Sequence, residues 1–160
     1  MCIKTKKVKW INKKTMIATF DIGKNIHYGY FRAPDGQERK PFSFCNAQKS
    51  FKQLWAEICR FKSDHQLEHI VVGFESTGTY AEPLFHFLSK KPVKLVQVNP
   101  VHTKRVKELT GKSPHKTDKK DPRVIADVIS LGHALTLVVP KGASAHLRRL
   151  TQARERALRD

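Results

Sequence analysis

The strongest constraint on the fold comes from two short apolar runs, residues 15–23 and 69–75, that each carry an acid at or near the end. Both runs are rich in β-branched and aromatic residues and are short for a core helix, so each predicts a buried strand. Asp21 lies near the end of the first run, and Glu75 ends the second. Functional groups of open sheets gather at the carboxyl ends of strands. If the two strands are neighbours, the two carboxylates face each other.

The other apolar runs predict a mixed sheet. Residues 26–32 and 39–45 are joined by a Pro-Asp-Gly turn signal at 34–36, so the first three strands are expected to form an antiparallel meander. A fifth strand is expected at 93–98, where an Asn-Pro pair ends it.

Helices separate the later strands. Residues 47–62 have apolar side chains at three- and four-residue intervals, which is typical of an amphipathic helix. Residues 80–90 predict a second helix with Pro83 in its first turn, where proline is tolerated. Strands that alternate with helices pair in parallel. We therefore expect an α/β protein with a mixed sheet, in which a three-stranded antiparallel meander continues into parallel strands flanked by helices.

The C-terminal part of the chain is strongly basic. Residues 101–120 contain seven Lys or Arg, and they are interpreted either as a solvated loop or as a segment that reaches a phosphate. Asp121 and Pro122 are expected to be the N-cap and first residue of a helix. Residues 135–139 predict a short strand or an extended link. Residues 144–160 predict a basic helix that stops without a cap, which suggests a longer protein.

The chain is expected to have three parts. Residues 1–14 contain six lysines and no acid, and we interpret them as a basic flexible arm. Residues 15–139 are long enough for one domain with its own core. Residues 140–160 would form the C-terminal basic helix.

The charge of the chain indicates its partners. Lys and Arg number 31 against 14 acids, a net charge of +17, which favours nucleic acid first and an anionic membrane surface second. No apolar run approaches the roughly 20 residues that span a bilayer, and the N-terminus lacks the apolar core of a secretory signal. Cys2, Cys45 and Cys59 are not paired at short spacing, so we interpret them as reduced thiols of a cytoplasmic protein.

Two further acids lie in the basic C-terminal part. Asp118 and Asp121 share one face of a helix if that helix extends back to Asp118; otherwise Asp121 alone is fixed at the helix N-terminus. Converging carboxylates repel each other unless a cation lies between them, and oxygen ligands suit Mg²⁺ (or Mn²⁺). Such ions can promote reactions of phosphodiesters. The predicted catalytic and metal-binding residues are therefore Asp21, Glu75, Asp118 and Asp121.

Each acid taken alone also has an ordinary structural interpretation. Asp21 could be a turn residue at a strand end, and Glu75 could cap the helix that follows. Asp121 could serve only as an N-cap. Asp118 could be solvated among lysines. The set is more informative, because acids are scarce in this chain and two of them end apolar strands.

Four motifs carry a family resemblance: residues 20–24 (FDIGK), 73–80 (GFESTGTY), 98–100 (VNP) and 116–121 (KTDKKD). In order and spacing they resemble the N-terminal domain of DEDD transposases of the insertion-sequence 110 family. The resemblance implies an RNase H-like (RuvC-like) domain that binds magnesium and takes part in cutting and exchanging DNA strands. The four acids of that family fall on Asp21, Glu75, Asp118 and Asp121. Pro122 departs from the alanine that is more usual there, and it suits a first helical position.

The resemblance also implies parts and partners beyond this chain. Residues 140–160 would begin a coiled-coil helix that leads to a C-terminal domain, absent here, with a serine that attacks DNA. The expected partners are DNA, a structured guide RNA and further copies in a dimer or tetramer of the full-length protein, with no membrane. Such a protein acts in the cytoplasm of a bacterium or archaeon, near the nucleoid. The isolated fragment is expected to be inactive.

Several basic and hydroxyl side chains are candidates for nucleic-acid contact, although a helix N-cap is the simpler role for Thr77. They are Lys24, Thr77, Lys104, Arg105, Lys119, Lys120, Arg148 and Arg149.

Parts of the sequence are also compatible with three other functions. A sugar-kinase or actin-like ATPase would need a second domain and a second phosphate loop. A stand-alone RuvC-type junction-resolving nuclease would share the four acids. A non-catalytic nucleic-acid-binding module would be supported by the charge alone.

Overall fold

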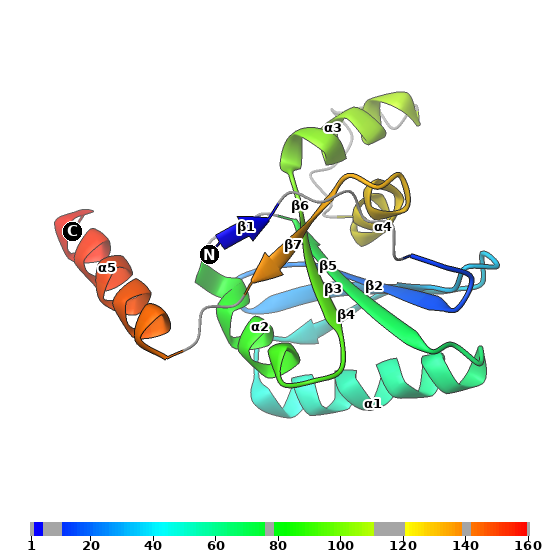
Figure 1. The fold of residues 1–160 in the computed structure, drawn as a ribbon, viewed down its shortest axis with the longest axis horizontal. Coiled ribbons are helices and arrows are strands. Elements are labelled where there is room, and N and C mark those ends of the chain that lie inside the picture. Colours follow the sequence, from blue (N-terminus) through cyan, green and yellow to red (C-terminus); the bar gives the residue numbers. More distant parts are fainter. Residues whose placement is uncertain (1, 5–10, 76–78, 111–120, 139–141, 160) are drawn as a thin grey trace.

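The computed structural model describes residues 2–4, 11–75, 79–110, 121–138 and 142–159. Its strands are β1 (Cys2–Lys4), β2 (Thr15–Asp21), β3 (Ile26–Arg32), β4 (Glu38–Cys45), β5 (His69–Glu75), β6 (Lys94–Val98) and β7 (Ala134–Val138). Its helices are α1 (Gln48–Asp64), the 3₁₀ turn η1 (Thr79–Ala81), α2 (Glu82–Ser89), α3 (Pro100–Leu109), α4 (Pro122–Ser130) and α5 (Ala143–Arg159). Figure 1 shows the strands at the centre of the molecule, with helices around them.

The strands form one mixed sheet of seven, in the order β1-β7-β6-β5-β2-β3-β4. β2, β3 and β4 make the antiparallel meander, while β5 pairs in parallel with both β2 and β6. β7 and β1 extend the other edge with antiparallel pairing. The predicted α/β fold is confirmed: a three-stranded meander continues into parallel strands flanked by helices, the arrangement expected of an RNase H-like domain.

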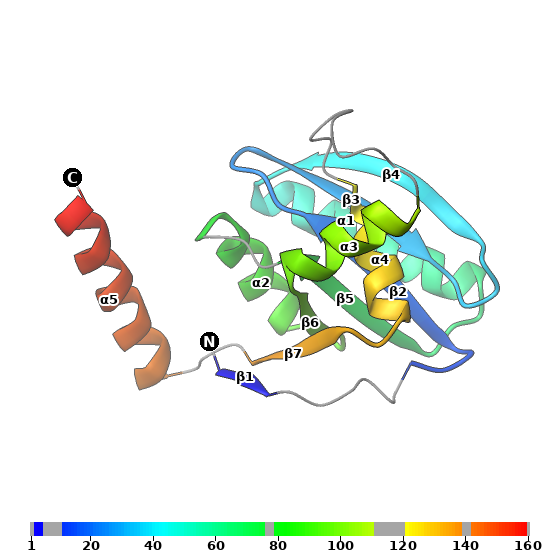
Figure 2. The same cartoon turned by 90° about the horizontal axis from the view of Figure 1, so that it is seen from above.

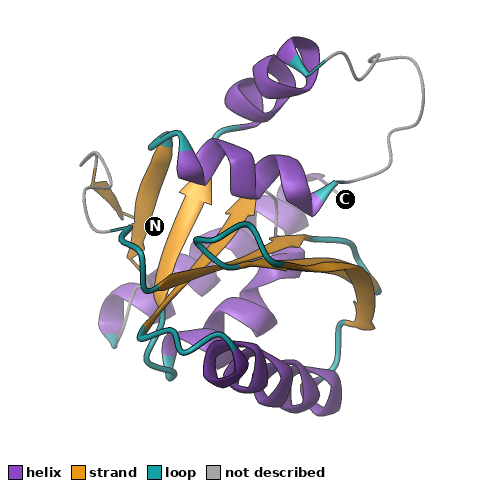
Figure 3. Cartoon of the chain, turned by 90° about the vertical axis from the view of Figure 1, so that its right-hand side faces the viewer, coloured by secondary structure: helices purple, strands orange, loops and turns teal. Residues whose placement is uncertain are grey.

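Helices cover both faces of the sheet. Figures 2 and 3 show α1 and α2 on one face and α4 on the other, with α3 beside α4. Side chains of β2 and β5 alternate between two cores, as expected for strands buried on both faces. Met16, Ala18, Phe20, Ile70, Val72 and Phe74 lie in the core under α1 and α2, whereas Ile17 and Val71 lie in the core under α4.

α4 lies close to the sheet because β5 has no side chain at the point of contact. A Cβ atom placed on Gly73 would lie only 2.1 Å from Ile129 Cδ1. The apolar residues of α4 that were expected to form its stripe are buried: Val124, Ile125, Val128 and Ile129.

The N-terminal segment contains a strand that we did not predict. β1 lies within the segment interpreted as a flexible arm, and it pairs antiparallel with β7, with Cys2 opposite Val138. A strand of three residues is too short to show a periodic pattern in the sequence. The C-terminal strand β7 resolves the alternative left open for that segment in favour of a strand.

The basic segment after β6 begins with a helix, where a solvated loop was one of our two interpretations. The side chain of Asn99 accepts a hydrogen bond from the Val101 N–H at 2.9 Å, so Asn99 is the N-cap of α3. Thr103 and Val106 are buried on the inner side of α3. The apolar side of α3 is narrow and many of its other residues are charged, so the sequence pattern does not reveal this helix.

α5 meets the rest of the protein at one acid of α2. Arg148 Nη2 lies 3.7 Å from Glu82 Oε1, and Gln152 Nε2 donates to the same oxygen at 3.1 Å. Three leucines of α5 are exposed: Leu147, Leu150 and Leu158. Among the helices that the structure describes, none has the length and apolar character to cross a membrane.

Candidate functional site

Asp21 and Glu75 end two neighbouring strands. β2 and β5 pair in parallel with Phe20 opposite Phe74, and each acid is the next residue on its strand. Neighbouring strands lie about 4.8 Å apart. The two strands that we expected to be neighbours are therefore adjacent, and their terminal acids share one edge of the sheet.

Both acids project toward the face that α4 covers. Thr19, two residues before Asp21, donates its hydroxyl hydrogen to the Pro122 carbonyl oxygen of α4 at 2.6 Å. Gly73, two residues before Glu75, lies against the same helix. Because side chains alternate along a strand, Asp21 and Glu75 point to this face as well. Asp21 is buried, with 7% of its surface exposed, and Glu75 is half-buried.

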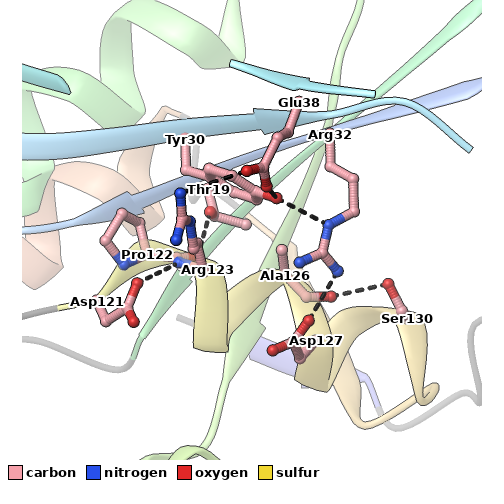
Figure 4. A network of polar contacts seen from close by, with 10 residues as sticks. All are labelled: Thr19, Tyr30, Arg32, Glu38, Asp121, Pro122, Arg123, Ala126, Asp127 and Ser130. Atoms are coloured by element: carbon pink, nitrogen blue, oxygen red, sulfur yellow. Dashed lines mark hydrogen bonds and ion pairs between the residues drawn. The ribbon is translucent and has the colours of Figure 1, made fainter. Parts of the chain in front are cut away.

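Asp121 stands at the N-terminus of α4, as predicted. Its Oδ1 accepts a hydrogen bond from the Arg123 N–H at 3.0 Å, so it is the N-cap of the helix (Figure 4). Pro122, which contacts Thr19 of β2, is the next residue. The start of α4 therefore lies on the same face as Asp21 and toward the same end of β2. Asp121 therefore has the ordinary capping role, and the helix that it caps begins on the same face of the sheet as Asp21.

The described side chains do not form a complete metal site. Within the part of the chain that the structure describes, no three His, Cys, Asp or Glu side chains lie close enough together to hold a metal ion. Asp21, Glu75 and Asp121 are all described, so these three carboxylates are not clustered closely enough to hold an ion; they lie at two strand ends and one helix N-terminus on the face of α4. Carboxylate oxygens are the donors that Mg²⁺ prefers, so this donor set fits that ion. The predicted residues outside the described ranges are Thr77, Asp118, Lys119 and Lys120.

A polar network holds α4 against β3 and β4 (Figure 4). Arg32 donates from Nη1 to Asp127 Oδ1 at 2.8 Å and from Nε to the Tyr30 hydroxyl oxygen at 3.0 Å. The Tyr30 hydroxyl donates to the carboxylate of Glu38. Arg123 Nη2 lies 3.3 Å from the other Glu38 oxygen. Arg32 thus links β3 to α4, and Arg123 links α4 to β4.

The environment within this network shifts the pKa values of Glu38 and Tyr30. The hydrogen bond from Tyr30 holds the pKa of Glu38 below its ordinary value of 4.5. Burial, reinforced by the hydrogen bond to Glu38, raises the pKa of the Tyr30 hydroxyl above 10.0. At neutral pH, Glu38 is therefore ionised and Tyr30 is a neutral donor. The contact that fixes α4 does not depend on a titration near pH 7.

Asn46 joins the two loops that follow the acids. Its Nδ2 donates to the Lys24 carbonyl oxygen at 3.1 Å and to the Tyr80 carbonyl oxygen at 3.2 Å. Lys24 lies in the turn after Asp21, and Tyr80 lies in η1, shortly after Glu75. One side chain thus sets the spacing of two loops at the candidate site. Sequence reasoning did not single out this residue, because its partners are 22 and 34 positions away.

The predicted nucleic-acid contacts that the structure describes fall on three elements. Lys24 is exposed in the turn between β2 and β3. Lys104 and Arg105 are exposed on α3, and Arg149 is exposed on α5. Arg148 lies in the ion pair with α2 described above. Lys24 is the described basic candidate whose turn directly follows a predicted acid.

A family comparison covers most of the chain. The model of the DEDD transposases of insertion-sequence 110 type, described as "Transposase", matches residues 18–160. No protein of curated function gives a match.

Three solved structures that resemble the chain are distant from it in sequence. RuvC of T. thermophilus in complex with a Holliday junction substrate is 12% identical, with a TM-score of 0.49, over 77% of this chain and 99% of that one. An exopolyphosphatase from Cytophaga hutchinsonii is 8% identical, with a TM-score of 0.34, over 57% of this chain and 36% of that one. A Ppx/GppA family member from Aquifex aeolicus is 13% identical, with a TM-score of 0.38, over 60% and 39% of the two chains. Likenesses this distant support no conclusion about activity.

Proposed function

Because this chain belongs to the DEDD transposase family of insertion-sequence 110 type, we propose that it is the catalytic domain of a metal-dependent DNA transposase that cleaves and exchanges DNA strands. One structural observation supports the proposal most. Asp21 and Glu75 end neighbouring parallel strands and project to the face of the sheet on which α4 begins after its N-cap, Asp121.

Four acids would hold Mg²⁺ (or Mn²⁺): Asp21, Glu75, Asp118 and Asp121. Metal held by these residues would supply activation of a water or hydroxyl nucleophile and charge stabilisation at the leaving oxygen of a phosphodiester. The sheet holds Asp21 and Glu75 at fixed spacing, and the network around Arg32 and Arg123 holds the start of α4. The carboxylates repel one another and repel a phosphate, so we expect DNA to bind at this edge only when a cation offsets their charge.

The remaining surface would hold the nucleic acid. The net charge of +17 suits a polyanion. The exposed Lys24, Lys104, Arg105 and Arg149 would contact phosphates, together with Thr77, Lys119 and Lys120. Arg148 would do so if DNA displaces its contact with Glu82.

The family resemblance supports a wider assembly. We place the catalytic domain at residues 15–139, after a basic segment at 1–14. Residues 140–160 would begin a coiled-coil helix that leads to a domain with a serine nucleophile. A structured guide RNA and further copies of the protein would complete the recombinase, and this chain by itself would be inactive.

The proposal is tested by isosteric replacement of the acids in the full-length protein. We expect each of Asp21→Asn, Glu75→Gln, Asp118→Asn and Asp121→Asn to reduce DNA strand cleavage at least a hundredfold while the protein stays folded. Removal of a group that only supports a metal ligand already costs about 10- to 100-fold, so removal of a ligand itself should cost at least as much. The matched control is Asp64→Asn at the exposed end of α1, which should leave cleavage unchanged.

Two outcomes would contradict the proposal. Cleavage that survives in the Asp21→Asn protein would remove these acids from the chemistry. Metal-dependent cleavage of branched DNA by the present chain alone would favour the stand-alone junction-resolving nuclease.

A further inference from the structure

β3 exposes two large apolar side chains beside the candidate site. Ile26 is 47% exposed and Tyr28 is 41% exposed, while His27 and Gly29 between and after them are buried. Ile26 and Tyr28 are two residues apart, so their side chains project to the same face of the sheet. We call these two side chains the apolar shelf.

The apolar shelf adjoins Asp21. β2 and β3 pair antiparallel with Asp21 directly opposite Tyr28. Residues opposite each other in such a pair have Cα atoms about 4.5–5.5 Å apart and project to the same face. Asp21 projects to the face of α4, so Tyr28 does too. The ring therefore stands next to a predicted metal ligand.

α4 covers the preceding row of side chains and leaves the apolar shelf open. Thr19 and Tyr30 are opposite each other in the same strand pair, and both are buried under α4. Thr19 meets the first residue of that helix, Pro122. The row of Asp21 and Tyr28 lies beyond this point. The open position of the ring thus follows from where the helix begins.

Tyr30, two residues further along β3, has a different environment from Tyr28. Tyr30 is fully buried, and its hydroxyl is bonded to Glu38 and Arg32. Among the described residues, the Tyr28 ring stacks on no other aromatic ring and its hydroxyl has no hydrogen-bond partner. Ser43, its neighbour on β4, is small and exposed. Packing within the domain therefore explains Tyr30 and does not explain the exposed ring of Tyr28.

An unpaired nucleotide fits this surface. Every base has an apolar face that stacks on aromatic side chains, and such contacts do not depend on sequence. The exposed Lys24, in the turn just before the shelf, can meet the phosphate of the same nucleotide. The net charge of +17 favours a polyanionic strand over an apolar peptide. A phosphate near Lys24 would lie close to the predicted metal ligands.

We propose that the apolar shelf packs against the base of an unpaired nucleotide in the DNA strand that enters the carboxylate site. The inference rests on the proposed function, because that function supplies the strand. The shelf orients the strand, while the acids act on its phosphate. It therefore predicts a preference for unpaired over fully paired DNA at the reacting position.

The test uses short DNA strands that differ only in their bases. The present chain is titrated with a single-stranded oligonucleotide and with one of the same length and charge whose central nucleotides are abasic. We expect the wild type to prefer the base-containing strand by about tenfold, the size of one aromatic–base contact. Tyr28→Ser should abolish that preference, while Tyr28→Phe should keep it. Binding of the abasic strand should be unchanged in both variants.

The control is Leu131→Ser. Leu131 is also an exposed apolar side chain, at 63%, but it is the C-cap of α4, at the opposite end of that helix from Asp121. Equal binding of the two strands by the wild type, or loss of preference in Leu131→Ser as large as in Tyr28→Ser, would overturn the proposal. Cleavage by the full-length acid variants tests the proposed function separately, since base preference is measured as binding by the present chain, which is expected to be inactive by itself, with Mg²⁺ present to offset the charge of the carboxylates.

Discussion

Arg32 on β3 and Asp127 on α4 form a hydrogen-bonded ion pair of 2.8 Å, although they are 95 positions apart in the sequence. α4 starts just after Asp121, so this contact fixes the helix whose N-cap is a predicted metal ligand. The side chains are 24% and 38% exposed, and solvent therefore weakens the interaction.

We predict a small but measurable coupling between Arg32 and Asp127. In a double-mutant cycle of Arg32→Ala and Asp127→Ala, the coupling free energy should be about 0.5–1 kcal/mol, as for partly exposed ion pairs. Urea denaturation of the four proteins measures it. Asp127→Ala should also weaken Mn²⁺ binding by this chain, because the start of α4 is less firmly held. A coupling indistinguishable from zero would mean that other contacts position the helix.

The Glu38–Tyr30 hydrogen bond predicts a pH dependence of stability. The pKa of Glu38 is lowered in the folded protein, so its contribution is fully present above pH 4.5 and is lost as the pH falls through the folded-state pKa. Glu38→Gln should remove this dependence, so the stability difference between wild type and variant should shrink on acidification below pH 4.5. Denaturant titrations between pH 3 and pH 7 measure it. The control is Glu155→Gln on α5, and a constant difference for Glu38→Gln would refute the prediction.

Asn46 should affect metal binding through the two loops it joins. Asn46→Ala removes two hydrogen bonds and should cost about 1–2 kcal/mol of stability. We also expect several-fold weaker Mn²⁺ binding, measured by calorimetry on the folded variant. The matched control is Asn12→Ala. The Asn12 side chain accepts two hydrogen bonds at the opposite end of β2. If both variants lose stability and neither loses Mn²⁺ affinity, Asn46 has only a structural role.

The substitution Gly73→Ala should be tolerated only if α4 moves away from β5. The Cβ atom of Gly73→Ala would clash with Ile129 Cδ1, so we expect a loss of about 1–3 kcal/mol. Ile129→Val removes that Cδ1 atom. The double variant should therefore be more stable than the additive sum of the single variants, as measured by thermal or urea unfolding. Strict additivity would show that the clash is relieved elsewhere.

The strands and helices that have a clear local sequence pattern were predictable. The strands near Asp21 and Glu75 stand out because they are apolar, short and bounded by turn residues. The alternation of strands and helices then implied their parallel pairing, which the sheet order confirms. β1 and α3 were missed, since β1 is very short and the buried side of α3 is limited to Thr103 and Val106 among described residues.

The contacts that support the site were not predictable. Arg32 with Asp127, and Asn46 with Tyr80, are pairs of polar residues that are ordinary in their local sequence. Only the folded arrangement makes them neighbours. The exposure of Tyr28 was not predictable either. The sequence places a tyrosine on a strand, but only the structure shows that α4 does not cover its ring. Asp118 lies outside the described residues, so its role remains the prediction made from the sequence.

The most direct test of the metal site is a crystal of this chain soaked with Mn²⁺ and measured for anomalous scattering. We predict Mn²⁺ at the carboxyl ends of β2 and β5, with oxygens of Asp21 and Glu75 about 2.0–2.2 Å away and Asp118 and Asp121 among the further ligands. No anomalous peak at this edge at saturating Mn²⁺, or a Glu75 side chain turned away from Asp21 in the Mn²⁺-soaked crystal, would contradict the central claim.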